Sequence, residues 1–391
     1  GDLVFPSGVK DISSDMNPTE MAKVLKKCCK FFSQLEQEEE DLKRTYLPFC
    51  HFITQDEFIK ETSDEHCRIL IGCILADLFR LYAPENPFRS GDKIKDIFMF
   101  VTDQLRLLKD SKGPFFPKAF HILENIATIK SYNICIDLDD PNTTLEIFCS
   151  VFKTLFSTVN SGHDKQVRTH MLDIMGFAIT DSASVPQPLL DIILECLLDT
   201  ARKMNPSAYE LARDLLKRTV VVVEQFLMQF FQNVILANRP EHSRMSAHWT
   251  KLIPELYKIT PQLLLSVLPQ LELRLRADNS KERLEVVTLL SDMWMIFINH
   301  GIKSTRNSQF LFTEQVVFTQ VRCACVNFFR SLAINHGTQS HYTREVMSYF
   351  KPRRHDTDDQ VRLTVVSCIR GIAIKDIQLA SDELLEFVKE R

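Results

Sequence analysis

The amino-acid sequence predicts an all-α fold, a HEAT/armadillo-type helical-repeat solenoid. Three observations lead to this prediction: apolar residues recur at helical spacing, the sequence repeats itself at a period near 40 residues, and glycine is rare. The chain has 10 glycines in 391 residues, whereas glycine is about 7% of an average soluble protein. Sheets and tight hairpins depend on glycine for their turns, so its scarcity favours helices.

Helical periodicity is clearest between Cys67 and Leu81, where apolar residues follow one another at steps of three and four. The same pattern recurs in Lys165–Ile179, Leu189–Ala201, Leu263–Leu275, Lys281–Ile298 and Val361–Ile374. Most prolines fall between these segments or at their starts, where they end one helix or begin the next. The longest apolar stretch, Thr219–Ala237, contains Glu224 and several amides. It therefore predicts a buried helix and not a membrane span.

Internal repetition identifies the kind of helical fold. Five residues recur at an offset of 40, with Val321, Arg322, Val326, Arg330 and Ala333 matching Val361, Arg362, Val366, Arg370 and Ala373. This period, with two helices per unit, is typical of HEAT and armadillo repeats. Aspartates precede several of the arginines at the repeated position, at Asp64, Asp164, Asp278 and Asp358. We expect each arginine to pair with the preceding aspartate or with one in a neighbouring repeat.

The repeat length also predicts the organisation of the chain. At roughly 17–20 residues per helix and turn, we expect about 18 to 22 helices in one curved array. Residues 1–15 are expected to form an extended N-terminal arm, and residues 16–391 a continuous array. We expect this array to be truncated at its C-terminal end, because the last helix stops at Arg391 without a capping signal.

Charge and cysteine content exclude some classes of function. The net charge is −4, from 47 basic and 51 acidic residues, so the chain lacks the basic excess typical of duplex DNA-binding proteins. Its 11 cysteines include no C-x-x-C pair. We expect reduced thiols and a cytosolic or nuclear protein.

No motif for catalysis or metal binding is present. The chain has no phosphate-binding glycine loop, nucleophile elbow or zinc-binding H-E-x-x-H sequence. The acidic run at Asp137, Asp139 and Asp140 lacks the glycine of a calcium loop. Cys50-His51 and His66-Cys67 are adjacent pairs, whose side chains diverge by about 100° on a helix. We therefore expect no enzyme, no metal and no cofactor.

The segment from Tyr82 to Phe88 is unusual. Pro84 is expected to end the preceding helix, and Pro87 to hold the chain extended before Ser90 or Asp92 begins the next helix. The segment is then either a rigid connection or a preordered recognition site for a short peptide, which such a turn can bind at little entropic cost.

The stretch Arg68–Phe88, RILIGCILADLFRLYAPENPF, resembles the Ala-Pro-Asp/Glu-Ala-Pro-Tyr/Phe signature region of the precocious-dissociation-of-sisters family of cohesin regulators. Further segments agree with that family in order: Tyr46–Pro48, Lys93–Phe100, Lys130–Cys135, Leu215–Val220 and Leu263–Leu271. The resemblance implies a HEAT-repeat scaffold in the nucleus, associated with chromatin, that docks on cohesin and controls its release or maintenance.

The resemblance also implies a site and partners. In that family the signature turn receives Tyr-Ser-Arg-type motifs of the release factor Wapl and of the competing protector sororin. Carried over, the site is Ala83, Pro84, Glu85, Asn86, Pro87 and Phe88, with Asn86 where the family has alanine. We expect the prolines to present backbone carbonyls and a shallow apolar surface, beside Tyr82 and Phe88, for the ligand's aromatic ring. Glu85 or Asp77 would then accept the ligand's arginine.

Other expectations concern the rest of the family's interactions. The kleisin and SMC subunits of cohesin are implied as partners, with contacts partly or wholly beyond this chain. Inositol polyphosphate is implied as a ligand, for which Lys23–Lys30 and Lys351–Arg354 are basic candidates, although ordinary solvated surface is the simpler interpretation. Two alternatives stay open. A HEAT adaptor or transport scaffold unrelated to cohesin would share the periodicity but not the literal Ala-Pro-x-x-Pro turn, and an enzyme would need a site assembled from distant residues.

Overall fold

The computed structural model of the chain confirms the all-α prediction. It describes residues 2–37, 40–235, 243–259, 351–356, 358–375 and 382–389, together with Ile377 and scattered positions between 267 and 289 and between 323 and 334. Throughout these residues the regular structure is helical and no strand occurs. None of the described helices is both long and apolar enough to cross a membrane. The expected total of 18 to 22 helices includes segments outside the described residues.

The chain divides into two compact units, one of residues 1–226 with 243–245 and one of residues 227–242 with 246–391. The α-helices of the first unit are α1 (Pro18–Ser33), α2 (Glu40–Ile53), α3 (Asp56–Ile59), α4 (Glu65–Tyr82), α5 (Gly91–Leu105), α6 (Phe116–Thr128), α7 (Pro141–Thr158), α8 (Lys165–Thr180), α9 (Gln187–Glu195) and α10 (Asp199–Met204). Helix α11 (Pro206–Ile235) belongs partly to each unit. The second unit contains α12 (Trp249–Ile259), α17 (Asp359–Lys375) and α18 (Asp382–Lys389).

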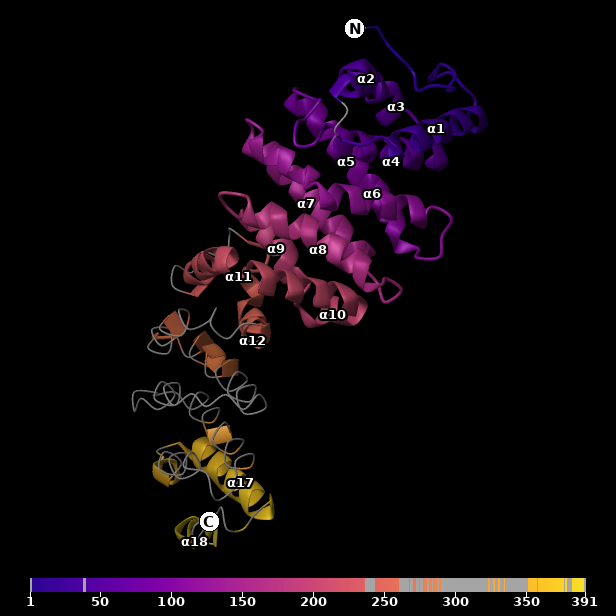
Figure 1. The fold of residues 1–391 in the computed structure, drawn as a ribbon. Helices are drawn as coiled ribbons and strands as arrows, with labels where there is room; N and C mark the ends of the chain where they lie inside the picture. The colour runs from indigo at the N-terminus through magenta and orange to yellow at the C-terminus, as the bar shows by residue number, and fades with distance from the viewer. Residues whose placement is uncertain are drawn as a thin grey trace. The chain divides into compact units, whose positions relative to one another are not determined.

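Helices of the first unit form two layers (Figure 1). In one layer α1 packs against α4, α4 against α6 and α6 against α8. In the other α5 packs against α7 and α7 against α9, while α2 lies against α4. Stacking of every second helix is the arrangement of helical-repeat proteins, in which each unit buries its apolar face against its neighbours.

The aspartates and arginines of the repeats have separate roles, which corrects one of the two pairings expected from the sequence. Asp64 and Asp164 are N-caps, and their carboxylates accept the N–H of Cys67 (2.8 Å) and of Val167 (2.9 Å). Neither pairs with the arginine four residues later, because a carboxylate at the N-cap turns towards the free N–H groups of its own helix.

The arginines bridge to other segments. Arg68 donates to the carbonyl of Thr62 in the preceding loop (3.1 Å) and to Asp103, 35 residues later (3.1 Å). Arg168 forms an ion pair with Glu210, 42 residues later (3.0 Å). In these two repeats the arginine therefore pairs with an acidic residue of a following helix, the second alternative from the sequence, whereas Arg362 pairs with Asp359 of its own helix.

The repeat is also visible in the second unit. Thr364 and Cys368 on α17 donate hydrogen bonds to Cys323 and to Asn327, each 41 residues earlier. The two segments whose sequences match at an offset of 40 are therefore neighbours in space.

Two expected boundaries differ in the structure. The periodic segment Leu189–Ala201 is divided between α9 and α10. Pro254 lies inside α12 instead of between helices. The apolar stretch from Thr219 is the second half of α11, a helix of 30 residues.

Residues 2–16 precede α1 without helical structure. The ring of Phe5 lies edge-on against Phe49 (6.0 Å between centroids) and Phe52 (5.5 Å) on α2, and Ile12 is buried. These contacts attach the segment to the first repeat. The division into an arm and a single continuous array stays a prediction.

Candidate functional site

The turn from Ala83 to Phe88 connects α4 to α5. The N–H of Ala83 donates to the carbonyl of Phe79 (3.0 Å) and closes the last turn of α4. Pro84 follows through a cis peptide bond. Pro84 and Glu85 are exposed, Ala83 and Asn86 are partly exposed, and Pro87 and Phe88 are buried. The turn therefore presents a tip of two residues to solvent.

Aromatic side chains fix both ends of this tip. Tyr82 is 5% exposed and its hydroxyl donates to the carbonyl of Lys43 on α2. Phe88 is 4% exposed, with its ring edge-on to Phe79 (5.9 Å) and His51 (6.1 Å). The tip is thus held between two buried anchors and is preordered.

Asn86, the position that departs from the family's alanine, has a local role. Its side-chain oxygen accepts the N–H of Phe88 at 3.0 Å. Asparagine side chains commonly bond the backbone two residues on, which stabilises a turn. The amide therefore folds back onto the turn instead of filling the surface beside Pro84.

Two features of the predicted site differ in the structure. Tyr82 and Phe88 are themselves buried, because their rings gain free energy in the core of the first repeats, and of the two prolines expected to present an apolar surface beside them only Pro84 is exposed. Asp77 cannot offer its carboxylate at the surface, because it is 1% exposed and bound within the protein. Ligand-accessible groups of the predicted set are thus Pro84 and Glu85, with Ala83 and Asn86 beside them.

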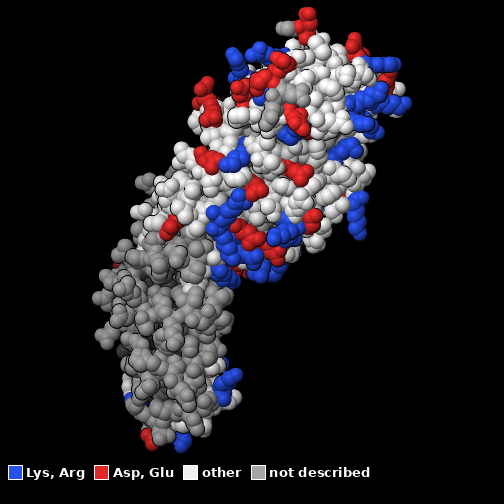
Figure 2. Space-filling model, viewed as in Figure 1, with Lys and Arg blue, Asp and Glu red and all other residues white. Residues whose placement is uncertain are grey.

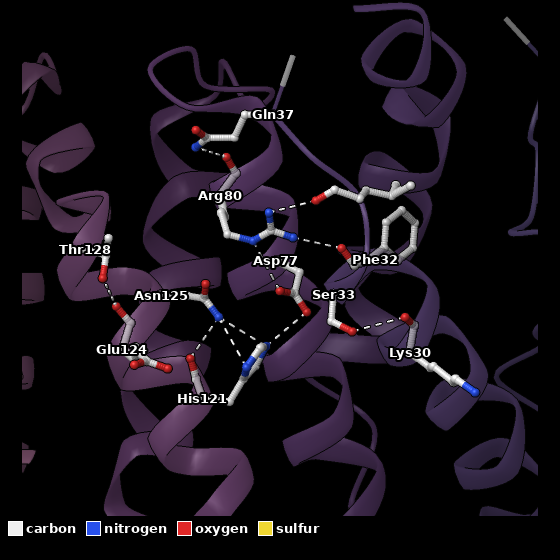
Figure 3. Close-up of polar contacts among 11 residues, drawn as sticks. Lys30, Phe32, Ser33, Gln37, Asp77, Arg80, His121, Glu124, Asn125 and Thr128 are labelled. Carbon is white, nitrogen blue, oxygen red and sulfur yellow. Dashed lines mark hydrogen bonds and ion pairs between the residues drawn. The ribbon is translucent and has the colours of Figure 1, made fainter. Parts of the chain in front are cut away.

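Asp77 instead lies at the centre of a polar network that joins α1, α4 and α6 (Figure 3). His121 on α6 donates from Nε2 to Asp77 Oδ2 at 3.1 Å. The other carboxylate oxygen is 3.6 Å from Nε of Arg80, one turn further along α4. Asn125 donates to the carbonyl of His121 (3.0 Å) and contacts its ring. A buried carboxylate needs such partners, since an unpaired buried charge is costly.

Arg80 extends this network to the end of α1. Its guanidinium donates from Nη2 to the carbonyl of Phe32 (2.9 Å) and from Nη1 to that of Leu35 (2.8 Å). Carbonyls at the end of a helix have no partner within the helix. Arg80 supplies one, and the carbonyl of Arg80 itself accepts from the side chain of Gln37 at 2.6 Å. Asp77 thus neutralises an arginine that fixes α1 to α4.

Protonation equilibria in this region follow the same contacts. The hydrogen bond to Asp77 raises the pKa of His121, and burial opposes this effect. The hydrogen bond between the Cys29 and Cys73 thiols, together with their burial, raises the pKa of Cys29. A thiol with a raised pKa is a poor nucleophile at neutral pH. The network itself ties α1, α4 and α6 together, as a structural joint does.

Sequence reasoning missed Arg80 and His121. Arg80 carried a weak signal, because basic side chains near a helix C-terminus often bond terminal carbonyls. His121 carried none, since its partner lies 44 residues away on another helix. Among the described residues no group of three or more histidine, cysteine or acidic side chains is arranged to hold a metal ion.

Comparison with known proteins gives a consistent result. A family model described as sister chromatid cohesion protein PDS5 matches residues 19–391. The chain is 40% identical to PDS5 homolog B of Homo sapiens and to PDS5 homolog B-A of Xenopus laevis, over 100% of its own length. It covers 27% of each of these relatives, so it spans about a quarter of their length.

A solved structure shows the same fold. It is described as the Pds5-Scc1 complex, with implications for cohesin function, and matches with a TM-score of 0.73 at 18% identity. The match covers 99% of this chain and 61% of the other. At this level of identity the likeness concerns the fold, and it confirms the helical-repeat prediction.

Proposed function

The chain belongs to the PDS5 family of sister chromatid cohesion proteins, and from this we propose that it is a non-enzymatic scaffold that associates with cohesin on chromosomes in the nucleus. Its role would be to control how long cohesin is maintained on, or released from, chromatin. The named relatives support the link to cohesion, and the complex with Scc1 in the related structure supports the kleisin subunit as a partner. The alternative of a transport scaffold unrelated to cohesin is disfavoured by the family match over residues 19–391.

More specifically, the turn Ala83–Phe88 would bind short Tyr-Ser-Arg-type motifs of a Wapl-like release factor or a sororin-like competitor. The observation that carries this proposal is that the turn is held at both ends by buried Tyr82 and Phe88 while Pro84 and Glu85 are exposed. A preordered turn loses little conformational entropy on binding.

The proposed contacts follow from the exposed groups. The ring of the motif's tyrosine would pack on Pro84, and its arginine would form a charge-assisted hydrogen bond with Glu85. An exposed ion pair contributes about 0.5–1 kcal/mol, so the apolar contact and backbone hydrogen bonds must supply most of the affinity. The expected dissociation constant is about 1–100 μM, which corresponds to about 5–8 kcal/mol.

The test is a fluorescence-anisotropy titration of the 391-residue chain with a labelled peptide that contains Tyr-Ser-Arg. Pro84→Lys combined with Glu85→Lys should weaken binding at least about tenfold, because both changes reverse the chemistry of the exposed tip. A peptide with alanine in place of tyrosine should bind as weakly as the native peptide does to this variant.

The matched control is Pro114→Lys combined with Glu57→Lys, two exposed positions outside the turn. It introduces the same side chains and the same charge change, and should leave the affinity within about twofold. Equal losses in both variants, or no binding by the native chain, would show that the turn is not the recognition site.

A further inference from the structure

Helix α1 presents an uncompensated basic surface. Lys23, Lys26, Lys27 and Lys30 are all exposed, and their spacing of three and four residues places them on one side of the helix. Within the described part of the chain none of the four forms an ion pair, whereas Lys43, Lys60 and Lys95 do. Along the helix axis the four lysines cover about 10 Å.

The basic surface continues across α4 to α6, because α1 packs on α4 and α4 packs on α6. Lys118 lies in the first turn of α6 and is partly exposed. The charges of Lys26 and Lys118, after burial, lower the pKa of His66 on α4. We call Lys23, Lys26, Lys27, Lys30 and Lys118 the α1–α6 lysine surface.

Nearby carboxylates are engaged elsewhere. Asp64 caps α4 through the N–H of Cys67 (2.8 Å), and Glu65 pairs with Arg106 (3.0 Å). Glu20 is exposed in the first turn of α1, one turn before Lys23, and bounds the lysine row at that end. The chain as a whole has a net charge of −4, so five lysines on two helices of one layer are a local departure from its average. Basic side chains gather at the edge of the molecule where α1 lies, beside a few acidic ones (Figure 2).

We infer that the α1–α6 lysine surface is a second docking site, which binds an acidic polypeptide segment of a partner protein. Adjacent packed helices lie about 8–10 Å apart, so α1 and α6 are separated by about 16–20 Å across α4. An extended run of about six acidic residues, at roughly 3.3 Å each, spans this distance. Such a run could contact lysines of both helices at once.

An acidic polypeptide fits these observations better than nucleic acid does. Five lysines neutralise few phosphates, and affinity for nucleic acid grows with the number of phosphates neutralised. The negative net charge of the chain also repels a long polyanion beyond the patch. A short acidic segment meets only the local positive potential. This site is separate from the turn at Ala83–Phe88 and does not depend on the function proposed for it.

The experiment measures binding of a fluorescein-labelled octaglutamate peptide to the full 391-residue chain, with an octaglutamine peptide for comparison. The four α1 lysines are changed together to glutamate: Lys23→Glu, Lys26→Glu, Lys27→Glu and Lys30→Glu. We expect the native chain to bind octaglutamate saturably and not to bind octaglutamine. The affinity for octaglutamate should fall at least about 30-fold in the variant. For the native chain it should fall about tenfold when the salt concentration is raised from roughly 50 to 200 mM.

A control of equal charge change separates a local site from bulk charge. It carries Lys153→Glu, Lys165→Glu, Lys203→Glu and Lys217→Glu, four exposed lysines on other helices, and should retain affinity within about threefold. Far-ultraviolet circular dichroism and thermal melting verify that both variants fold. Equal weakening in the two variants overturns the proposal, as does failure of the native chain to bind octaglutamate. Tighter binding of a 20-nucleotide single strand through the same lysines would overturn the choice of partner.

Discussion

Phe88 loses almost all contact with solvent, with 4% of its surface exposed, because its ring packs edge-on against Phe79 and His51. Phe88→Ala would remove these contacts and leave a cavity. We expect the free energy of unfolding to fall by about 3 kcal/mol, measured by urea denaturation. Phe88→Leu, which keeps most of the volume, should lose less than about 1.5 kcal/mol. Nearly equal free energies of unfolding for the native protein and for Phe88→Ala would show that the ring is not an anchor of the turn.

The pair of Asp77 and His121 makes a pH-dependent contribution to stability. The hydrogen bond to Asp77 raises the pKa of His121 in the folded state. The folded-state pKa therefore lies above the value of about 6.5 that a histidine has in an unfolded chain. The contribution is therefore complete below the unfolded pKa and is lost as the pH rises through the folded pKa. It should stay below about 1 kcal/mol, because the side chain is 34% exposed and water screens the pair.

The measurement compares urea denaturation of the native chain with that of His121→Gln between pH 5.5 and 8. Glutamine can donate a hydrogen bond to Asp77 but does not titrate. The stability difference between the two proteins should decrease as the pH rises, since other titratable groups are common to both. A difference that is constant across this range would show that the pair does not raise the pKa of His121 in the folded state.

In α4 one residue caps the start of the helix and another ties the helix to its neighbour. Asp64 caps α4, whereas Arg68 reaches Asp103 near the end of α5. Asp64→Ala should cost about 1 kcal/mol through loss of the cap. A double-mutant cycle for Arg68 and Asp103 should give a coupling of about 0.5–1 kcal/mol, and one for Asp64 and Arg68 should give a coupling near zero. Strong coupling in the second cycle would restore the pairing that the sequence suggested.

The bounds of a helix could be predicted from the sequence where residues close to its ends mark them. The span of α4 was predicted to within two residues, from Cys67–Leu81 to Glu65–Tyr82, because apolar spacing and Pro84 mark both ends. The break between α9 and α10 was missed, because Leu197 and Leu198 continue the apolar pattern while the backbone leaves the helix.

The candidate site was predicted less well than the helices. The non-helical turn follows from its two prolines, but the burial of Tyr82 and Phe88 depends on α2, whose Lys43 and His51 precede them by more than 30 residues. The same holds for Asp77, whose partner on α6 no local pattern reveals. Whether a side chain at a turn is exposed depends on the helices that pack around it, and the sequence of the turn alone does not show this.

On the scale of the whole molecule, stacking of every second helix makes stability a sum of nearest-neighbour terms. Helix α1 is the first of its layer and packs there against α4 alone, whereas α4 and α6 each pack against two helices of the layer. The network of Arg80 at the end of α1 strengthens this interface, and the rings of Phe31 and Phe32 also contact α2. We therefore expect α1 to open before the helices that follow it, at a free energy below that of the whole unit.

Leu25→Ala tests this order of opening. Leu25 is fully buried on α1, and its truncation should cost about 2–4 kcal/mol. In a nearest-neighbour stack this loss lowers the free energy of opening for α1 and for the helices that contact it, but not for α7 and α9. Native-state hydrogen exchange should therefore accelerate by at least about 30-fold within residues 18–33 and stay within about threefold at residues 141–195. Leu155→Ala, at a fully buried position on α7, serves as the reciprocal control, with its effect centred on α7. If Leu25→Ala instead accelerated exchange equally along the first unit, that unit would unfold as one cooperative block, and the nearest-neighbour description would not hold for it.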